Sequence, residues 1–351
     1  MEIQKVVELP VKGKMRKGMN TNALQQLLAF ASLIVLVVIF SIASANFLQF
    51  DNIIGIFLST AVTGILALGA TMIIVTSGID LSCGTVLTLS SVMTGVFAVN
   101  LGLPVWVAVL GGILIGAVVG LISGAAIAKL KIPPFIATLA MMMIAKGLAL
   151  VISKATPIYF TSIPSFNKIA MGSIIPGFAI PNAVFIFFGM AIFASLILNK
   201  TIIGRYTFAL GSNEEATRLS GVNVDKWKII IYMLAGVFTG VAGIIMASRL
   251  NSAQPALGAG YELEAIAAVV IGGTSLSGGK GTILGTVIGG TSLSGGKGTI
   301  LGTVIGALIM SVLTNGLQIL SVPQEWQTVV VGAVILLAVY ADVLRNKKAK
   351  N

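Results

Sequence analysis

The sequence contains ten apolar stretches, most of them about as long as a helix must be to cross a bilayer, and this pattern constrains the fold most strongly. The hydrocarbon core of a bilayer is about 30 Å thick, so a helix that crosses it needs roughly 20 mostly apolar residues. Only 9% of the residues are charged, whereas a soluble domain has about 25%. We therefore expect an all-α, polytopic helical bundle of about ten transmembrane helices. One predicted span, 260–274, is short, and another, 84–100, is open to irregular structure. The predicted spans are residues 25–45, 53–75, 84–100, 104–128, 133–153, 182–198, 229–248, 260–274, 299–320 and 326–343.

Lysine and arginine gather in the segments that would lie on one side of the membrane. If the basic N-terminal segment, residues 1–24, is placed inside, 18 of the 22 Lys and Arg residues fall in predicted cytoplasmic segments. Cytoplasmic loops of membrane proteins carry such an excess of positive charge. The sequence therefore predicts that both termini are cytoplasmic, including the basic tail at 345–351. The four basic residues left over are Lys146, within a predicted span, and Lys154, Lys168 and Arg249, in predicted outer segments.

The first apolar run has an alternative interpretation. Residues 15–17 are Met-Arg-Lys, and residues 43–45, Ala-Ser-Ala, resemble a signal-peptidase site. The apolar run between them is as long as a span, however, and further spans follow directly. We expect it to be retained as a helix, and cleavage would leave the later topology unchanged.

Residue types that serve metal binding or general-base catalysis are scarce. The chain has no histidine and a single cysteine, Cys83, which removes the usual zinc ligand and general base and excludes an internal disulfide. We expect no catalytic residue, no metal site and no cofactor bound by this chain, so a membrane-embedded enzyme is the least favoured alternative. The net charge of +11 follows from the basic cytoplasmic segments, so no nucleic-acid partner is expected.

A glycine-rich segment with a central lysine, IGGTSLSGGKGTILGTV, occupies residues 271–287. A phosphate-binding P-loop requires G-x-x-x-x-G-K-[ST]. Aligning Gly279 and Lys280 with that pattern puts Thr274 where the first glycine belongs and Gly281 where Ser or Thr belongs. Since the preceding residues belong to a predicted membrane span, the segment is not a P-loop.

Close packing of backbones explains the glycines better, because small residues let helices approach in lipid. The patterns Gly281-x-x-x-Gly285 and Gly302-x-x-x-Gly306 fit this interpretation. The alternative is a moving element near a translocation path. The segment is also duplicated, since residues 271–289 and 288–306 agree at all nineteen positions, which makes 271–304 a tandem repeat. We expect the extra copy to enlarge a cytoplasmic loop or to shift a neighbouring helix, either of which would impair function.

The most polar internal stretch is the predicted cytoplasmic loop at 199–228. Asn213 is placed to cap a short helix whose first turn carries Glu214 and Glu215, which is favourable at the positive end of the helix dipole. Gly221 is placed to end that helix. A capped helix on the cytoplasmic face is either a docking element or an ordinary loop helix.

This loop resembles a known motif. Glu215-Ala216-Thr217, followed three residues later by Gly221, resembles the E-A-A-x-x-x-G coupling motif of ABC importer permeases, with Thr in place of the second Ala. The segments SAQPALGAGYELEAIAAVVIGGTSLSGGKG at 252–281 and GIDLSCGTVLTLSS at 78–91 are similar to ribose-type sugar permeases. The likeness runs roughly from residue 50 to 343, although that family carries one copy of the glycine-rich segment.

The resemblance implies that residues 25–343 form a single transmembrane permease domain in the bacterial cytoplasmic (inner) membrane, working as a homodimer. It implies a cytoplasmic ABC ATPase that holds ATP and magnesium, and an extracytoplasmic binding protein that delivers a monosaccharide. Ribose is the leading candidate, with other sugars or sugar-like signal molecules as alternatives. The residues expected to dock the ATPase are Asn213, Glu214, Glu215, Ala216, Arg218 and Gly221.

A few polar residues lie in or beside the predicted spans. Acids at such positions are costly and usually have a partner, so Asp80, with Ser82, either caps the helix that follows or takes part in sugar contact or gating. Asn315 and Gln318, one turn apart, could hydrogen-bond a solute or another helix. Glu262 and Glu264 are expected near the outer surface, as contacts for the binding protein or as a solvated helix end.

A proton-coupled secondary transporter is the competing function. Such a transporter would have carboxylates or histidines at mid-membrane and often repeated halves with broken helices. Here Asp80 is the only candidate for that role, and the resemblance at the cytoplasmic helix favours an ATPase partner.

Overall fold

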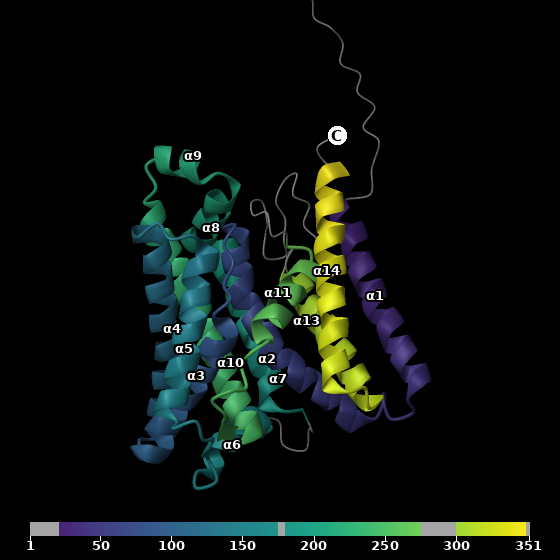
Figure 1. Cartoon of the computed structure of the whole chain (residues 1–351). Helices are drawn as coiled ribbons and strands as arrows, with labels where there is room; N and C mark the ends of the chain where they lie inside the picture. Colours follow the sequence, from purple (N-terminus) through teal and green to yellow (C-terminus); the bar gives the residue numbers. More distant parts are fainter. Residues whose placement is uncertain (1–20, 175–179, 275–299, 349–351) are drawn as a thin grey trace, which may run out of the picture.

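The computed structural model describes residues 21–174, 180–274 and 300–348, with side chains for residues 29–174, 180–274 and 300–340. Helices make up nearly all of the regular structure in these ranges (Figure 1). The helices that overlap predicted spans are α1 (Thr21–Ala43), α2 (Phe50–Val75), α3 (Cys83–Gly95), α4 (Val105–Lys129), α5 (Pro134–Ile152), α7 (Asn182–Lys200), α10 (Val224–Leu250), α11 (Tyr261–Ile271), α13 (Ile300–Ile319) and α14 (Gln324–Lys348). The other elements are the π-helix η1 (Val96–Asn100), α6 (Pro164–Met171), α8 (Ile202–Ser212), α9 (Glu214–Leu219) and the short strands β1 (Ile158–Tyr159) and β2 (Ser252–Ala253).

Seven helices in the described ranges are long and apolar enough to cross a bilayer. They are α2, α4, α5, α7, α10, α13 and the continuous run of α3 and η1. The π-helix at the end of that run is the irregular structure for which the sequence left room. Helices α1 and α14 contain shorter apolar stretches, Ala29–Ala43 and Gln324–Tyr340. The protein is therefore a mostly helical, polytopic bundle, while the total of ten spans and the cytoplasmic position of both termini stay predictions.

Helix α11 is the exception among the predicted spans. It has 11 residues, and at 1.5 Å per residue it covers about 16 Å, roughly half the thickness of a bilayer core. The helix ends at Gly272, and the next residue, Gly273, has a φ of 93°. The predicted span 260–274 is therefore short, as expected, and its helix is shorter than the predicted range, because hydrophobicity alone does not report where a helix stops.

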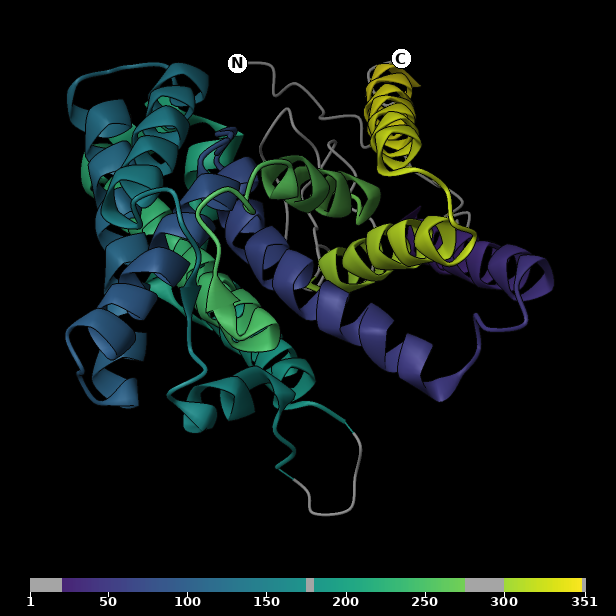
Figure 2. The ribbon, with the colours of Figure 1, turned by 60° about the horizontal axis from the view of Figure 1, so that its bottom comes forward.

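The helices form two groups, as Figures 1 and 2 show from two directions. Helices α3, α4, α5 and α10 pack together in one group, and α1, α13 and α14 form the other. Helix α2 joins the groups, because it packs against both α10 and α13. Every residue of α2 from Thr60 to Val75 is buried, so α2 forms the centre of the core.

Glycines set the close approach of α4 and α10. A Cβ atom on Gly116 of α4 would collide with the backbone carbonyl of Gly236 in α10, and one on Gly120 would collide with that of Tyr232. In lipid, such backbone-to-backbone packing supplies much of the attraction between helices. These glycines therefore hold α4 and α10 in contact along most of their length.

The same type of packing joins α11 to α13. A Cβ atom on Gly306 would collide with the carbonyl of Ala268, and one on Gly272 would collide with that of Gly302. This confirms the close packing predicted for Gly302 and Gly306. The other predicted pattern, Gly281-x-x-x-Gly285, and Lys280 lie outside the described residues, as does most of the 271–304 repeat.

The two ends of the bundle carry different structures. Helix α9 lies at one end, and α6 lies at the opposite end (Figure 1). Strands β1 and β2 form an antiparallel pair in which Ile158 is opposite Ala253 and Tyr159 is opposite Ser252. The predicted topology places α9 in the cytoplasm and the α6 end outside. The strand pair is a small departure from the all-α expectation.

Candidate functional site

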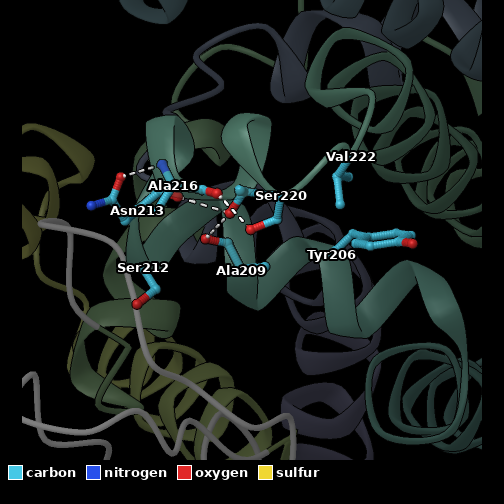
Figure 3. A pocket seen from close by; sticks show the side chains of 8 residues that line it. Tyr206, Ala209, Ser212, Asn213, Ala216, Ser220 and Val222 are labelled. Atoms are coloured by element: carbon cyan, nitrogen blue, oxygen red, sulfur yellow. Dashed lines mark hydrogen bonds between the residues drawn. The ribbon is translucent and has the colours of Figure 1, made fainter.

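Helix α9 is built by the two residues predicted to begin and end it. The Asn213 side chain accepts a hydrogen bond from the backbone N–H of Ala216 at 2.9 Å (Figure 3). Gly221 has a φ of 83°, and its N–H donates to the carbonyl of Arg218. The N–H of Val222 donates to the carbonyl of Thr217, which completes a Schellman ending. Both the predicted cap and the predicted stop are confirmed.

Thr217, the residue that departs from the coupling motif, has a structural role. Its hydroxyl lies 2.8 Å from the carbonyl oxygen of Asn213 and 3.0 Å from that of Ala209 in α8. The side chain is buried between the two helices. An alanine could not form these contacts, so the threonine ties α9 to α8.

A pocket of about 290 Å³ lies between α8 and α9 (Figure 3). Next to it, the ring of Tyr206 packs on the ring of Trp227 with centroids 4.7 Å apart. Sequence reasoning did not find this pocket, because its wall combines two helices and the turn after them. The residues that line it are Tyr206, Ala209, Ser212, Asn213, Ala216, Thr217, Ser220 and Val222.

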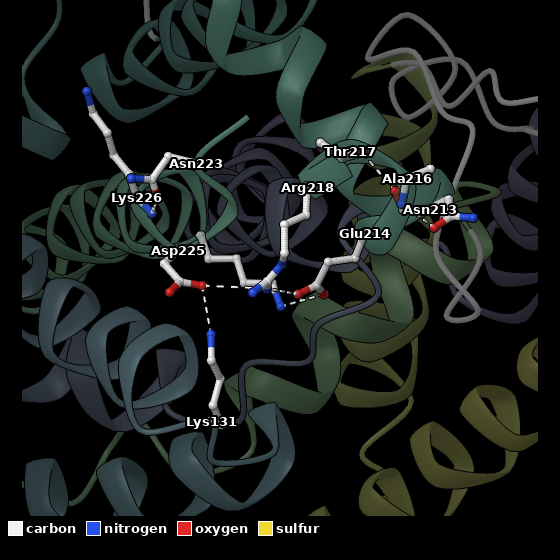
Figure 4. A network of polar contacts seen from close by, with 10 residues as sticks. Lys131, Asn213, Glu214, Ala216, Thr217, Arg218, Asn223, Asp225 and Lys226 are labelled. Carbon is white, nitrogen blue, oxygen red and sulfur yellow. Dashed lines mark hydrogen bonds and ion pairs between the residues drawn. The ribbon is translucent and has the colours of Figure 1, made fainter. Parts of the chain in front are cut away.

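A chain of ion pairs holds α9 to the rest of the predicted cytoplasmic end (Figure 4). Glu214 pairs with Arg218 at 3.3 Å and with Lys228 of α10 at 2.6 Å. Asp225 of α10 pairs with Lys131, in the connection between α4 and α5, at 2.8 Å, and with Arg218 at 3.8 Å. Each exposed pair is worth about 0.2–1 kcal/mol, so the network fixes orientation more than it adds stability.

The residues predicted to dock the ATPase therefore fall into two groups: those that make contacts within the chain and those that are exposed. Glu214 and Arg218 are engaged within the chain, and Asn213 and Gly221 shape the helix ends. Glu215 and Ala216 are exposed, and Glu215 forms no ion pair within the described part of the chain. Leu219, which sequence reasoning missed, has 83% of its surface exposed. Helix α9 thus presents an exposed acid and an exposed apolar side chain on a rigidly held turn.

Asp80 lies in the turn between α2 and α3. Its Oδ1 accepts hydrogen bonds from the Ser82 backbone N–H at 2.8 Å and from the Ser82 hydroxyl at 2.6 Å. Burial raises the pKa of the Asp80 carboxyl, and the Ser82 hydrogen bonds oppose that shift. Thr138 of α5 bonds the same turn at the carbonyl of Ile79 and the N–H of Leu81. Asp80 and Ser82 therefore shape the turn that leads into α3. The N-cap residue of α3 is Ser82, and it makes no side-chain capping hydrogen bond, so the predicted capping is not seen, and a role in sugar contact or gating is untested.

Asn315 of α13 forms two hydrogen bonds with Asn52 of α2, at 2.8 and 3.0 Å, as each amide donates to the other. This is the helix-to-helix alternative of the prediction. Gln318 is exposed and does not join the pair. Asn52 begins α2 and Asp80 follows its end, and 26 residues of helix span about 39 Å. The structure therefore does not bring Asn315 and Asp80 together.

The two acids at the start of α11, Glu262 and Glu264, differ in burial. Glu262 is buried at the start of α11, where its carboxylate accepts from the N–H of Gly260 at 3.1 Å and lies against Gly84 of α3. The hydroxyl of Thr63 in α2 donates to Glu264 at 3.3 Å. The expected location is therefore wrong for Glu262, because the first turn of α11 packs against α3 at this residue, whereas Glu264 is half-buried. Contact with a binding protein stays a prediction that these positions do not support.

Among the described residues, the side chains of Cys, Asp and Glu form no group of three or more that could hold a metal ion.

Comparison with known proteins defines the class of protein. Residues 52–339 match the family described as the permease component of branched-chain amino acid transport systems. The chain belongs to this permease family. With seven helices in its described ranges able to cross a bilayer, it is a multi-pass protein of the bacterial cytoplasmic (inner) membrane.

Its relatives include several sugar permeases. The chain is 41% identical to the ribose import permease protein RbsC of Escherichia coli K12 over 90% of its length and 92% of that protein. It is 42% identical to the ribose import permease protein RbsC of Bacillus subtilis over 93% and 95% of the two chains. The L-arabinose transport system permease protein AraH of Escherichia coli is 37% identical over 91% of each chain. No solved structure gives a significant match.

Proposed function

We propose that the chain is the membrane-spanning permease subunit of an ATP-driven importer that carries ribose. The observation that carries this proposal is the similarity to ribose import permeases over nine-tenths of both chains, at 41–42% identity. Permeases named for fructose, D-allose and L-arabinose are 35–37% identical. Because the identity to the ribose permeases is higher, ribose is favoured over those sugars as the substrate.

The geometry of α9 supports an ATPase partner. A six-residue helix that is capped at both ends and held by ion pairs is a firm surface for a second protein. Two of its exposed side chains, Glu215 and Leu219, are of the kinds that dock on a partner: one is charged and the other is apolar. A cytoplasmic ABC ATPase that holds ATP and magnesium would grip this helix and supply the energy of transport.

Two further partners complete the proposal. A second copy of the chain forms a homodimer, with a translocation path between the two subunits. An extracytoplasmic binding protein delivers the sugar on the other side. ATP binding moves the paired α9 helices and opens the path outward, and hydrolysis resets it, so that each side has access to the path in turn.

The test is uptake of labelled ribose into membrane vesicles that contain the chain, its ATPase and its binding protein. The proposal predicts uptake that requires ATP and is unaffected by a protonophore. Uptake that continues without ATP and collapses with the protonophore would contradict it and favour a proton-coupled transporter. Competition by unlabelled arabinose, fructose or allose, each in excess, identifies the sugar.

A further inference from the structure

The basic residues of the predicted outer side gather in one place. Lys154 lies between α5 and β1, Lys168 lies in the last turn of α6, and Arg249 lies in the last turn of α10. Strand β1 pairs with β2, which directly follows α10, so the three segments meet. Positive charge is disfavoured on the outer side of a membrane protein. Two of the three exceptions, Lys154 and Lys168, belong to one structural unit, and this unit packs against the end of α10 that carries Arg249. This arrangement indicates that the charge has a use there.

This unit, residues 153–174, is called the outer ledge here. It is fastened to α10 by Ser248, whose hydroxyl donates to the carbonyl of Phe166 at 2.7 Å and accepts from the N–H of Ala170 at 2.9 Å. The side chain of Asn167 donates to the carbonyl of Ser248 at 2.9 Å. The rings of Phe160 and Phe166 stack with centroids 3.8 Å apart. The ledge is therefore preorganised, which limits the entropy lost when a partner binds.

The exposed face of the ledge has the chemistry of a protein interface. Lys154 and Lys168 are exposed, and neither forms an ion pair within the described part of the chain. Exposed apolar and aromatic side chains accompany them, namely Tyr159, Met171 and Ile174. Residues 153–174 contain no acidic residue. Aromatic residues and methionine are enriched at protein interfaces, and an unneutralised basic surface attracts an acidic partner.

We propose that the outer ledge is the docking surface for an acidic face of the extracytoplasmic binding protein, which rests on the proposed importer function. Of the two acids expected at first to make this contact, Glu262 is buried and Glu264 is half-buried. The ledge lies at the end of the molecule opposite α9 (Figure 1). It therefore faces the side from which a binding protein approaches.

Helix α10 connects the ledge to the ATPase side. Its outer end carries Ser248, which fastens the ledge, and its inner end carries Asp225 and Lys228, which pair with residues of α9. The helix is continuous over 27 residues, or about 40 Å. Docking at the ledge and docking at α9 therefore act on the two ends of one helix.

The experiment uses the full permease with its ATPase in lipid nanodiscs and, as the probe, the purified sugar-binding protein of the same importer. A double variant, Lys154→Glu with Lys168→Glu, should weaken binding of the probe at least tenfold at low ionic strength. Raising the salt concentration should weaken binding of the probe to the wild type until its affinity approaches that of the variant, because exposed charges are screened. The affinity of the variant should change little. Hydrolysis of ATP without the probe should be unchanged.

The matched control is Lys200→Glu. Lys200 is also an exposed lysine in the last turn of a helix, but at the predicted cytoplasmic end, and its reversal should leave binding of the probe unchanged. If the double variant and the wild type bind the probe with equal affinity, the proposed docking role of the ledge is overturned, even if ribose uptake supports the importer. A double variant that keeps its affinity for the probe but loses affinity for phosphatidylglycerol vesicles would also overturn it and assign the ledge to lipid. A wild type that neither binds the probe nor takes up ribose with ATP would overturn both proposals.

Discussion

Leu219 offers the sharpest test of the ATPase docking surface. Its side chain is 83% exposed although it lies on a helix that is firmly held by its caps and ion pairs. Fully burying a leucine side chain stabilises a complex by about 1.5–3 kcal/mol. Because so little of Leu219 is covered within the chain, a bound partner can still gain most of this energy. Since alanine keeps only the Cβ, we expect Leu219→Ala to remove about 1–2 kcal/mol of ATPase binding. This corresponds to roughly five- to thirtyfold weaker affinity, at about 1.4 kcal/mol per tenfold.

The assay is equilibrium binding of the purified ATPase to the permease in nanodiscs, with the thermal midpoint of the permease measured in parallel. The midpoint should not move, because the side chain has few contacts to lose. The matched control is Leu101→Ala, another leucine largely exposed, at 61%, but on the connection after η1 at the opposite end of the bundle. Unchanged ATPase affinity in Leu219→Ala, or an equal loss in Leu101→Ala, would refute the docking role of α9.

Four further outcomes are expected. Thr217→Ala should weaken the contact between α8 and α9 by about 1 kcal/mol, the usual contribution of a hydrogen bond. Amide hydrogen exchange in α9 should then be faster than in the wild type, whereas Thr217→Ser should leave the exchange rate unchanged. Asn52→Ala should lower the free energy of unfolding by about 1–3 kcal/mol because it leaves a partly buried amide without its partner; an unchanged thermal midpoint in detergent would contradict this. Gly116→Leu should prevent α4 from packing on α10 and abolish recovery of folded protein, whereas Gly147→Leu, where nothing lies within 4 Å of an added Cβ, should be recovered normally. Deleting residues 271–287, one copy of the repeat, should preserve or raise transport, and a loss of folding would show that the second copy is required.

The features that the sequence predicted well are those encoded locally. A run of about twenty apolar residues specifies a membrane-length helix by itself, so the positions of the long helices follow from hydrophobicity. The ends of α9 also depend on neighbouring residues alone: Asn213 bonds an N–H three residues ahead, and Gly221 adopts a positive φ that few other residues tolerate. These predictions need no knowledge of the tertiary structure.

The predictions that failed depend on contacts between distant segments. Glu262 stands at the start of an apolar run, which is equally typical of a solvated helix end and of a helix that begins inside the bundle. Its contact with Gly84 decides between them, and that contact joins two segments far apart in the chain. The pair formed by Asn52 and Asn315 is likewise separated by 263 residues. The sequence contains the polar residues of such contacts but does not reveal which residues meet.

The outer ledge illustrates the same limit. The charge pattern identified Lys154, Lys168 and Arg249 as exceptions to the cytoplasmic bias, but they stand in two segments far apart in the chain. Only the pairing of β1 with β2 and the hydrogen bonds of Ser248 bring them together. The packing of these segments places two exposed lysines, Lys154 and Lys168, on one unit beside the end of α10 that carries Arg249.

Uptake of labelled ribose into vesicles that contain the chain, its ATPase and its binding protein, with and without ATP, tests the importer account most directly. The account predicts uptake with ATP and none without it, in the chain as it stands or after removal of one copy of the 271–304 repeat. If neither form takes up ribose with ATP while the same vesicles accumulate another sugar, ribose is contradicted as the substrate. Uptake that proceeds without ATP would contradict the ATP-driven importer itself.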